Sequence, residues 1–411
     1  MASNLFYDRI HLLTGNRLNI DPADPPISIL QRYYPLLGNK HKESNIVLSD
    51  VANLVNNTLS RKEEYGDTTL DKWGRFDYAK SFLVQNGLDQ TPIIDELILD
   101  VIKQLGLKAR NIWPEGKRMA VCLTHDVDAI DGFSYFWLRK INWYWHWFRA
   151  KLKGNQQADN NWASTLERWK RYKKANFDPM DSFGQIQELE DSYGFRSTFF
   201  FMSLHHGLSR EGRRYSVQNP KVAKTAEKLL EGGWEIGLHA AYHNHLSLSL
   251  LKEQKQRLED VIREDISGCR HHYLRVRFPD SWKIYAEAGF KYSSNMGWGS
   301  RFQGFRAGTC LPYQPLGEYP LLEIPFQLMD TNPIADTESY MNKFSKYLSS
   351  VKAVNGCLLI DFHQEHFQEE VSPGVGRVYR NILDTIARDQ DVAVLTMNEV
   401  CKIMKQVGKL S

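Results

Sequence analysis

Residues 117–128 read KRMAVCLTHDVD, an apolar run that ends directly in a histidine and two carboxylates. Short apolar runs of this kind, separated by longer helical stretches, are typical of strands in an α/β fold. We expect such strands at RMAVCLT (118–124), RSTFFFMS (196–203), WEIGLH (234–239), HYLRV (272–276), LLEIPF (321–326), GCLLIDF (356–362) and VAVLTM (392–397).

The segments between these runs have the apolar spacing of helices. We expect helices at residues 181–193, 220–230, 250–266, 281–288, 336–351 and 376–388. Alternating strands and helices predict a largely parallel sheet, as a barrel or an open α/β sheet, with the chemistry at the carboxyl ends of the strands.

The first hundred residues have a different pattern of apolar residues. Amphipathic helices are predicted at residues 50–59 and 91–107, and the second begins at Thr91 and Pro92, which are favourable residues for a first turn. We therefore expect a mixed α/β N-terminal accessory region at residues 1–112 and the main α/β domain at residues 113–411.

Composition narrows the class of protein. Lys and Arg number 52 against 49 Asp and Glu, so the chain has no overall nucleic-acid footprint. No apolar stretch is long enough to span a membrane, and the start lacks the pattern of a signal peptide. The five cysteines are scattered and form no C-x-x-C pair, which argues against a thiolate metal site. We expect reduced thiols and a cytoplasmic protein.

Carboxylates and imidazoles follow three of the predicted strands. Asp126 and Asp128 end the first run, His239 and His243 follow WEIGL, and His363 follows GCLLIDF. Each motif alone is as common on a solvated helix or in a turn, but their coincidence at strand ends favours a site. Two histidines four residues apart and one carboxylate can hold zinc or a similar divalent ion.

Five other histidines lack this placement after a strand. We therefore assign them to structural or surface positions: His205, His206, His245, His271 and His272.

The ordered motifs resemble those of the polysaccharide deacetylase family, also called the NodB homology or carbohydrate esterase family. They are THDVD (124–128), STFFF (197–201), EIGLH (235–239) with His243, AGFKY (288–292) and the strand into His363. The resemblance covers residues 117–405 and implies an irregular (β/α) barrel. The segments SRKEEY (60–65) and WGRF (73–76) resemble, more weakly, the N-terminal region of bacterial members.

The resemblance implies a metal-dependent removal of acetyl groups from an N-acetylated sugar of a bacterial glycan or glycan precursor. It places the base that activates water at Asp126 and the metal ligands at Asp128, His239 and His243. The metal would be zinc, with cobalt, nickel or others as alternatives, and would polarise the acetyl carbonyl and lower the pKa of bound water.

The resemblance also implies an acid and an arginine. The acid that protonates the leaving group falls on His363, and the arginine that steadies the base falls on Arg270, with Arg275 as the alternative. The chain departs from the family pattern at Ser293, where relatives often carry an aspartate. Asp330, after LLEIPFQLM, is a candidate for the orienting carboxylate instead.

Residues 133–153 carry four tryptophans and five basic side chains but no acidic one. A helix packed over the barrel is the plainest interpretation. The alternatives are sugar-stacking aromatics near the site and a face that lies on an anionic membrane, such as the inner membrane, which would suit a lipid-linked saccharide.

Three other functions stay open at this point. They are an amidohydrolase for a small non-sugar amide, a carbohydrate-binding pseudoenzyme with the same fold, and a structural metal site. Structural sites usually have four protein ligands, and the sequence offers three.

Overall fold

The computed structural model describes most of the chain. The described residues are 4–16, 26–28, 31–37, 46–66, 69–130, 136–152, 154, 170, 181–203, 215–299, 302–317, 319–330, 334, 336–369 and 372–409.

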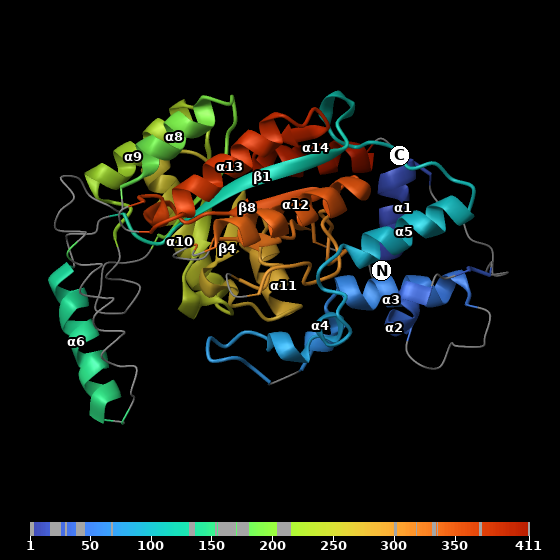
Figure 1. Cartoon of the computed structure of the whole chain (residues 1–411), viewed down its shortest axis with the longest axis horizontal. Helices are drawn as coiled ribbons and strands as arrows, with labels where there is room; N and C mark the ends of the chain where they lie inside the picture. The colour runs from blue at the N-terminus through green and yellow to red at the C-terminus, as the bar shows by residue number, and fades with distance from the viewer. Residues whose placement is uncertain are drawn as a thin grey trace.

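A parallel sheet forms the centre of the molecule (Figure 1). Its strands are β1 Met119–Val127, β2 Thr198–Phe201, β3 Glu235–Ala240, β4 Gly268–His271, β5 Tyr292–Ser293, β6 Leu322–Glu323, β7 Leu328–Met329, β8 Cys357–Asp361 and β9 Val392–Val394. The order is β6-β5-β4-β3-β2-β1-β8-β7, and β9 pairs with β1. The two outermost strands, β6 and β7, are consecutive in the chain, so the sheet curls back on itself.

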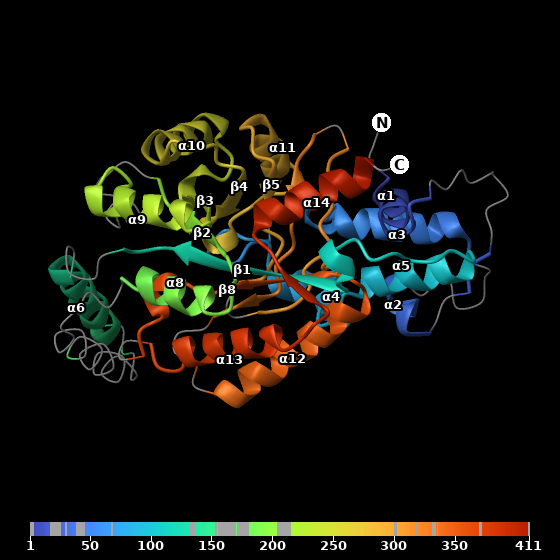
Figure 2. The same ribbon diagram turned by 90° about the horizontal axis from the view of Figure 1, so that it is seen from above.

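Helices cover the outside of this curled sheet (Figure 2). They are α8 Phe183–Asp191, α9 Pro220–Glu231, α10 Leu248–Ile262, α11 Asp280–Glu287, α12 Thr337–Ala353, α13 Val375–Ala387 and α14 Met397–Lys409. In α13 the apolar side chains recur at helical spacing and are buried, including Val378 and Ile382. The prediction of an irregular (β/α) barrel is confirmed.

The N-terminal part is mainly helical, with α1 Leu5–Thr14, α2 Tyr34–Leu37, α3 Leu48–Leu59, α4 Phe82–Gln85 and α5 Ile93–Gln104. Buried polar contacts join it to the barrel: Asp95 accepts from Thr309 Oγ1 (2.7 Å), and Glu64 accepts from Arg306 Nη2 (2.7 Å). Because these polar groups are buried, breaking either contact would cost stability. The two parts therefore share one core.

The structure differs from the sequence predictions at one strand and at one helix. The strand predicted at residues 272–276 is wrong: β4 ends at His271, and residues 272–274 form a turn in which Tyr273 has φ +61°. The helix predicted within residues 133–153 exists as α6 Phe136–Leu152, but apolar side chains along it, such as Trp145 and Leu152, are exposed and not packed over the barrel as predicted. No helix among the described residues is both long and apolar enough to cross a membrane.

Candidate metal and catalytic site

The carboxyl ends of the parallel strands meet at one edge of the sheet and surround a cavity of about 140 Å³. Residues that line it include Arg75, Asp126, Asp128, His239, His272 and His363. The sequence analysis predicted four of these side chains as site residues, and the structure brings those four together.

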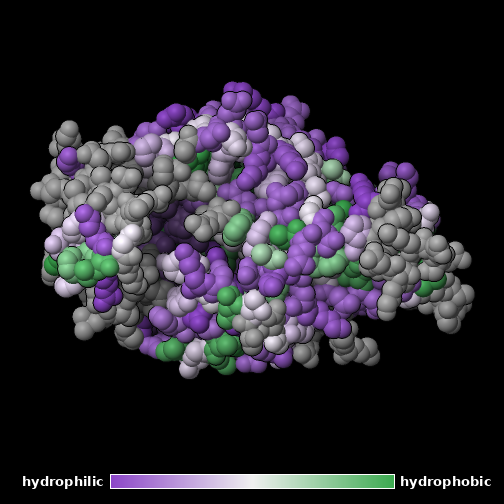
Figure 3. Space-filling view, turned by 60° about the horizontal axis from the view of Figure 1, so that its bottom comes forward, coloured by the Kyte–Doolittle hydropathy of each residue, from purple (hydrophilic) through white to green (hydrophobic). Residues whose placement is uncertain are grey.

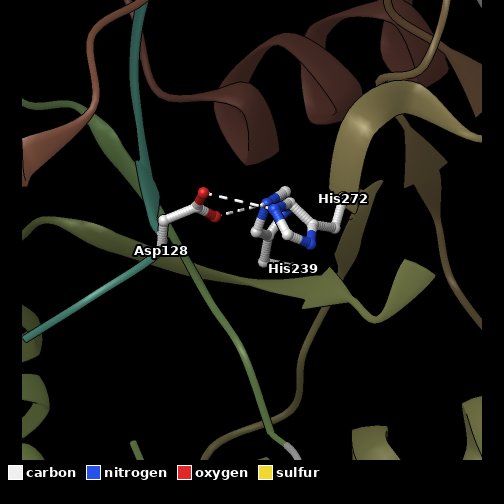
Figure 4. Close-up of side chains that lie close together, drawn as sticks. All are labelled: Asp128, His239 and His272. Carbon is white, nitrogen blue, oxygen red and sulfur yellow. Dashed lines mark hydrogen bonds and ion pairs between the residues drawn. The ribbon is translucent and has the colours of Figure 1, made fainter. Parts of the chain in front are cut away.

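Three side chains at the cavity present ligand atoms within 4.8 Å of one another: Asp128, His239 and His272. The Asp128 carboxylate lies 3.3 Å from His239 Nε2 and 3.2 Å from His272 Nε2. In Figure 4 the carboxylate and the two rings face one another. Two imidazoles and one carboxylate are a donor set that fits a catalytic zinc ion.

The structure does not bring His243 to this group. His239 lies in β3, where the chain is extended, so the interval of four residues to His243 is not a helical turn. His243 instead lies on an exposed 3-10 turn with its ring against Tyr242. His272 joins Asp128 and His239 in the group that could hold a metal ion, because β4 ends at His271 and the chain turns there. The sequence had placed His272 at a structural or surface position, whereas it lies buried at the cavity.

The hydrogen bonds of His239 fit a cation. Its Nδ1 lies 3.1 Å from the carbonyl oxygen of Arg270, which can only accept, so Nδ1 carries the proton. Nε2 then faces the carboxylates of Asp128 (3.3 Å) and Asp126 (3.7 Å). Burial lowers the pKa of His239, but the two carboxylates outweigh it and raise the pKa. A bare nitrogen facing two carboxylates is satisfied by a proton or by a divalent ion.

Arg270 holds Asp126 in place. Its Nη1 donates to Asp126 Oδ1 (2.9 Å), Asp361 Oδ1 (2.7 Å) and Thr124 Oγ1 (3.0 Å). Burial raises the pKa of Asp126, but His239 and Arg270 outweigh it, and the pKa is lowered. Asp126 is therefore ionised and able to accept a proton.

Arg275, the other candidate for this role, lies elsewhere. It donates to the carbonyl of Tyr242 (3.1 Å) and lies over that ring, 4.2 Å from its centroid. Of the two arginines, Arg270 is the one that contacts Asp126.

Asp361 was not foreseen from the sequence. It ends β8, is fully buried and shares the guanidinium of Arg270 with Asp126. Burial and the charge of Asp126 raise its pKa to about 6. The sequence feature that could have identified Asp361 is its place as an aspartate inside the apolar run GCLLIDF.

His363 lines the cavity and is held by Asp330. Its Nδ1 lies 2.8 Å from Asp330 Oδ1, and Asp330 Oδ2 accepts from the backbone N–H of His363 (3.2 Å). Burial lowers the pKa of His363, but Asp330 outweighs it, and the pKa is well above its usual value. His363 is thus a cationic acid at neutral pH. Asp330 also lies 2.9 Å from His366 Nδ1.

Ser293, at the position of the family's aspartate, faces away from this chemistry. Its hydroxyl donates to the buried carboxylate of Glu323, which also accepts from Trp282 Nε1 (2.9 Å) and Asn295 N (2.6 Å). Ser293 therefore belongs to a network behind the cavity.

A protein-family model matches part of the chain. A family of unknown function (DUF7033) matches residues 7–109, within the predicted N-terminal region. No protein with a curated description matches the chain.

Several solved structures are similar in fold. A Mycobacterium smegmatis protein assigned as a polysaccharide deacetylase is 18% identical, with 72% of this chain and 92% of that chain covered and a TM-score of 0.48. An allantoinase is 13% identical, with 72% and 93% covered and a TM-score of 0.46. A mutant pseudoenzyme of carbohydrate esterase family 4, with restored activity, is 12% identical, with 70% and 69% covered and a TM-score of 0.33.

Proposed function

We propose that the chain is a metal-dependent hydrolase that removes an acetyl group from an N-acetylated sugar. The observation that carries the proposal is the set of groups around one cavity: a three-residue metal ligand set, an ionised carboxylate at Asp126 and a cationic imidazole at His363. A metal, a general base and a general acid together can hydrolyse an amide.

Asp128, His239 and His272 would hold the metal, which when bound polarises the acetyl carbonyl and lowers the pKa of water. Asp126 takes one proton from the attacking water, whose oxygen bonds to the carbonyl carbon. His363 gives its proton to the nitrogen as the C–N bond breaks, so that acetate and an amine leave. Arg270 keeps Asp126 ionised, and Asp330 keeps His363 protonated and oriented.

A small amide is the second candidate substrate, because the cavity is small. About 140 Å³ is less than the roughly 300–1,000 Å³ of common ligand pockets, so the cavity takes an acetylated end or a small molecule.

The test is acetate release by purified protein from a panel of N-acetylated saccharides, with ammonia and carboxylate release from small amides measured in parallel. We expect acetate release that stops with a chelator, returns with added zinc or cobalt, and is lost in Asp126→Asn and His363→Gln. Bound metal without turnover of any substrate would favour a binding protein instead.

A further inference from the structure

The turn that carries His272 has a strained backbone. The two residues after it, Tyr273 and Leu274, have φ values of +61° and +53°. Side chains other than glycine rarely adopt this region, and consecutive ones persist only where their surroundings hold them. His272 presents its ring to Asp128 from this turn.

A loop of the N-terminal region holds the turn in place. The Trp73 ring stacks on the Tyr273 ring, with centroids 4.6 Å apart and planes 10° apart. The Arg75 guanidinium donates to the carbonyl of Tyr273 (3.4 Å) and lines the cavity beside the ligands.

The loop is itself ordered by one carboxylate. Asp71 accepts from the backbone N–H of Trp73 (2.8 Å) and from the backbone N–H and Nε of Arg75 (3.0 and 2.8 Å). Gly74 has φ +71°, and a Cβ there would lie 2.9 Å from Arg275 Nε, so the loop fits closely against the barrel.

We propose that the N-terminal region is part of the metal site: its loop at residues 71–76 holds the strained turn after His272 and so fixes the third ligand. This inference rests on the proposed function, because it presumes a metal at Asp128, His239 and His272. It assigns a role to Trp73 and Arg75, which lie within residues 7–109. Both are positioning residues and take no part in proton transfer.

The test is the metal dissociation constant of the full chain, measured by competition with a chromophoric chelator. Trp73→Ala should weaken metal binding by about 10- to 100-fold, the range for residues that support metal ligands. Phe82→Ala, an exposed aromatic of the same region, is the matched control and should bind as the wild type does. If Trp73→Ala binds the metal as tightly as the wild type does, this inference is wrong but the proposed function stands. If the wild-type protein binds no metal, the proposed function is wrong as well.

A second variant separates positioning from general loss of folding. Glycine adopts positive φ without strain, so Tyr273→Gly in the Trp73→Ala background should recover part of the lost metal affinity. If affinity instead falls together with the melting temperature and glycine restores neither, Trp73 only stabilises the fold and the inference fails.

A separate observation concerns helix α6, which stands at the end of the molecule in Figures 1 and 2. Large apolar side chains at helical spacing are exposed along it: Ile141 (47%), Tyr144 (50%), Trp145 (55%), Phe148 (40%) and Leu152 (73%). The steps of three, one, three and four residues place them on one face. Figure 3 shows green side chains at this left-hand end.

The charges around this face point to its occupant. Residues 133–153 contain no acidic residue, and Arg149 and Lys151 are exposed on α6. A basic helix with a tryptophan- and tyrosine-bearing apolar face lies in the interface of an anionic bilayer. We infer that α6 docks the chain on an anionic membrane surface, where a lipid-linked saccharide would be within reach.

The test is co-sedimentation of the full chain with vesicles of phosphatidylcholine, with or without phosphatidylglycerol. Binding should require the anionic lipid, weaken in high salt, and fall about tenfold in a Trp145→Ser and Phe148→Ser double variant. Leu246→Ser, at an exposed leucine outside α6, is the control. Absence of vesicle binding, or a dimer that depends on the α6 face instead, overturns the inference.

Discussion

Replacing His272 by alanine should weaken metal binding severely, whereas the same change at His243 should leave it intact. The two residues represent two different ligand sets for one site. His272 is buried, and its Nε2 lies 3.2 Å from Asp128, while His243 is exposed on the turn after β3.

The magnitude follows from the number of ligands. Zinc binds to structural four-ligand sites with about 10–16 kcal/mol, which is roughly 2.5–4 kcal/mol for each ligand. Since each 1.4 kcal/mol is about tenfold, losing one of three ligands should raise the dissociation constant by about 100- to 1,000-fold. A water that replaces the imidazole would bring the loss toward the lower value.

The assay is chelator competition with zinc or cobalt, together with a thermal melt of each variant in the presence of chelator. The melting temperatures measured in chelator show whether a variant has lost folding stability or only a metal ligand. If His243→Ala loses the metal and His272→Ala keeps it, His272 is not a ligand. The ligand set implied by the sequence resemblance, with His243, would then be the correct one.

Three further predictions concern the groups around the metal and the core. Asp330→Asn removes the charge that raises the pKa of His363, so the alkaline limb of the kcat/KM profile should move to lower pH; an unmoved limb would exclude His363 as the acid. Arg270→Lys should lower kcat by about tenfold or more while Arg275→Lys changes it little, because Arg270, unlike Arg275, bridges Asp126 and Asp361; equal effects in steady-state assays would contradict this. Ile382→Ala should lower the free energy of unfolding in urea by about 2–5 kcal/mol, and a much smaller loss would mean that α13 is not firmly packed.

Much of the site could be predicted because parallel strands end at the same edge of a sheet. Asp126, Asp128, His239 and His363 each follow an apolar run, and that placement alone brings them to one cavity. The hydrophobic periodicity of the helices was equally readable, since it depends only on near neighbours in the chain.

The third residue of the proposed ligand set could not be predicted in the same way. The choice of His243 assumed a helical interval, but the structure extends the chain through His239. His272 depends on where β4 ends and on positive φ at Tyr273 and Leu274, which their residue types do not indicate. Contacts with the N-terminal loop, about 200 residues away in the chain, stabilise that turn.

The buried charge pairs were hidden for a related reason. Asp361 reads as one polar residue in an apolar strand, and only the fold places it against Arg270 beside Asp126. Asp330 could be suggested as an orienting carboxylate from its place after a strand, whereas its contact with His363 depends on the neighbouring arrangement of β7 and β8.

The most direct test of the account is the position of the metal itself, from anomalous diffraction at the zinc or cobalt edge on crystals of the loaded protein. The proposed ligand set predicts one strong peak about 2.0–2.2 Å from an Asp128 carboxylate oxygen, His239 Nε2 and His272 Nε2, the usual zinc distances. A peak coordinated by His243, or one held by Asp330, His363 and His366 instead, would contradict it.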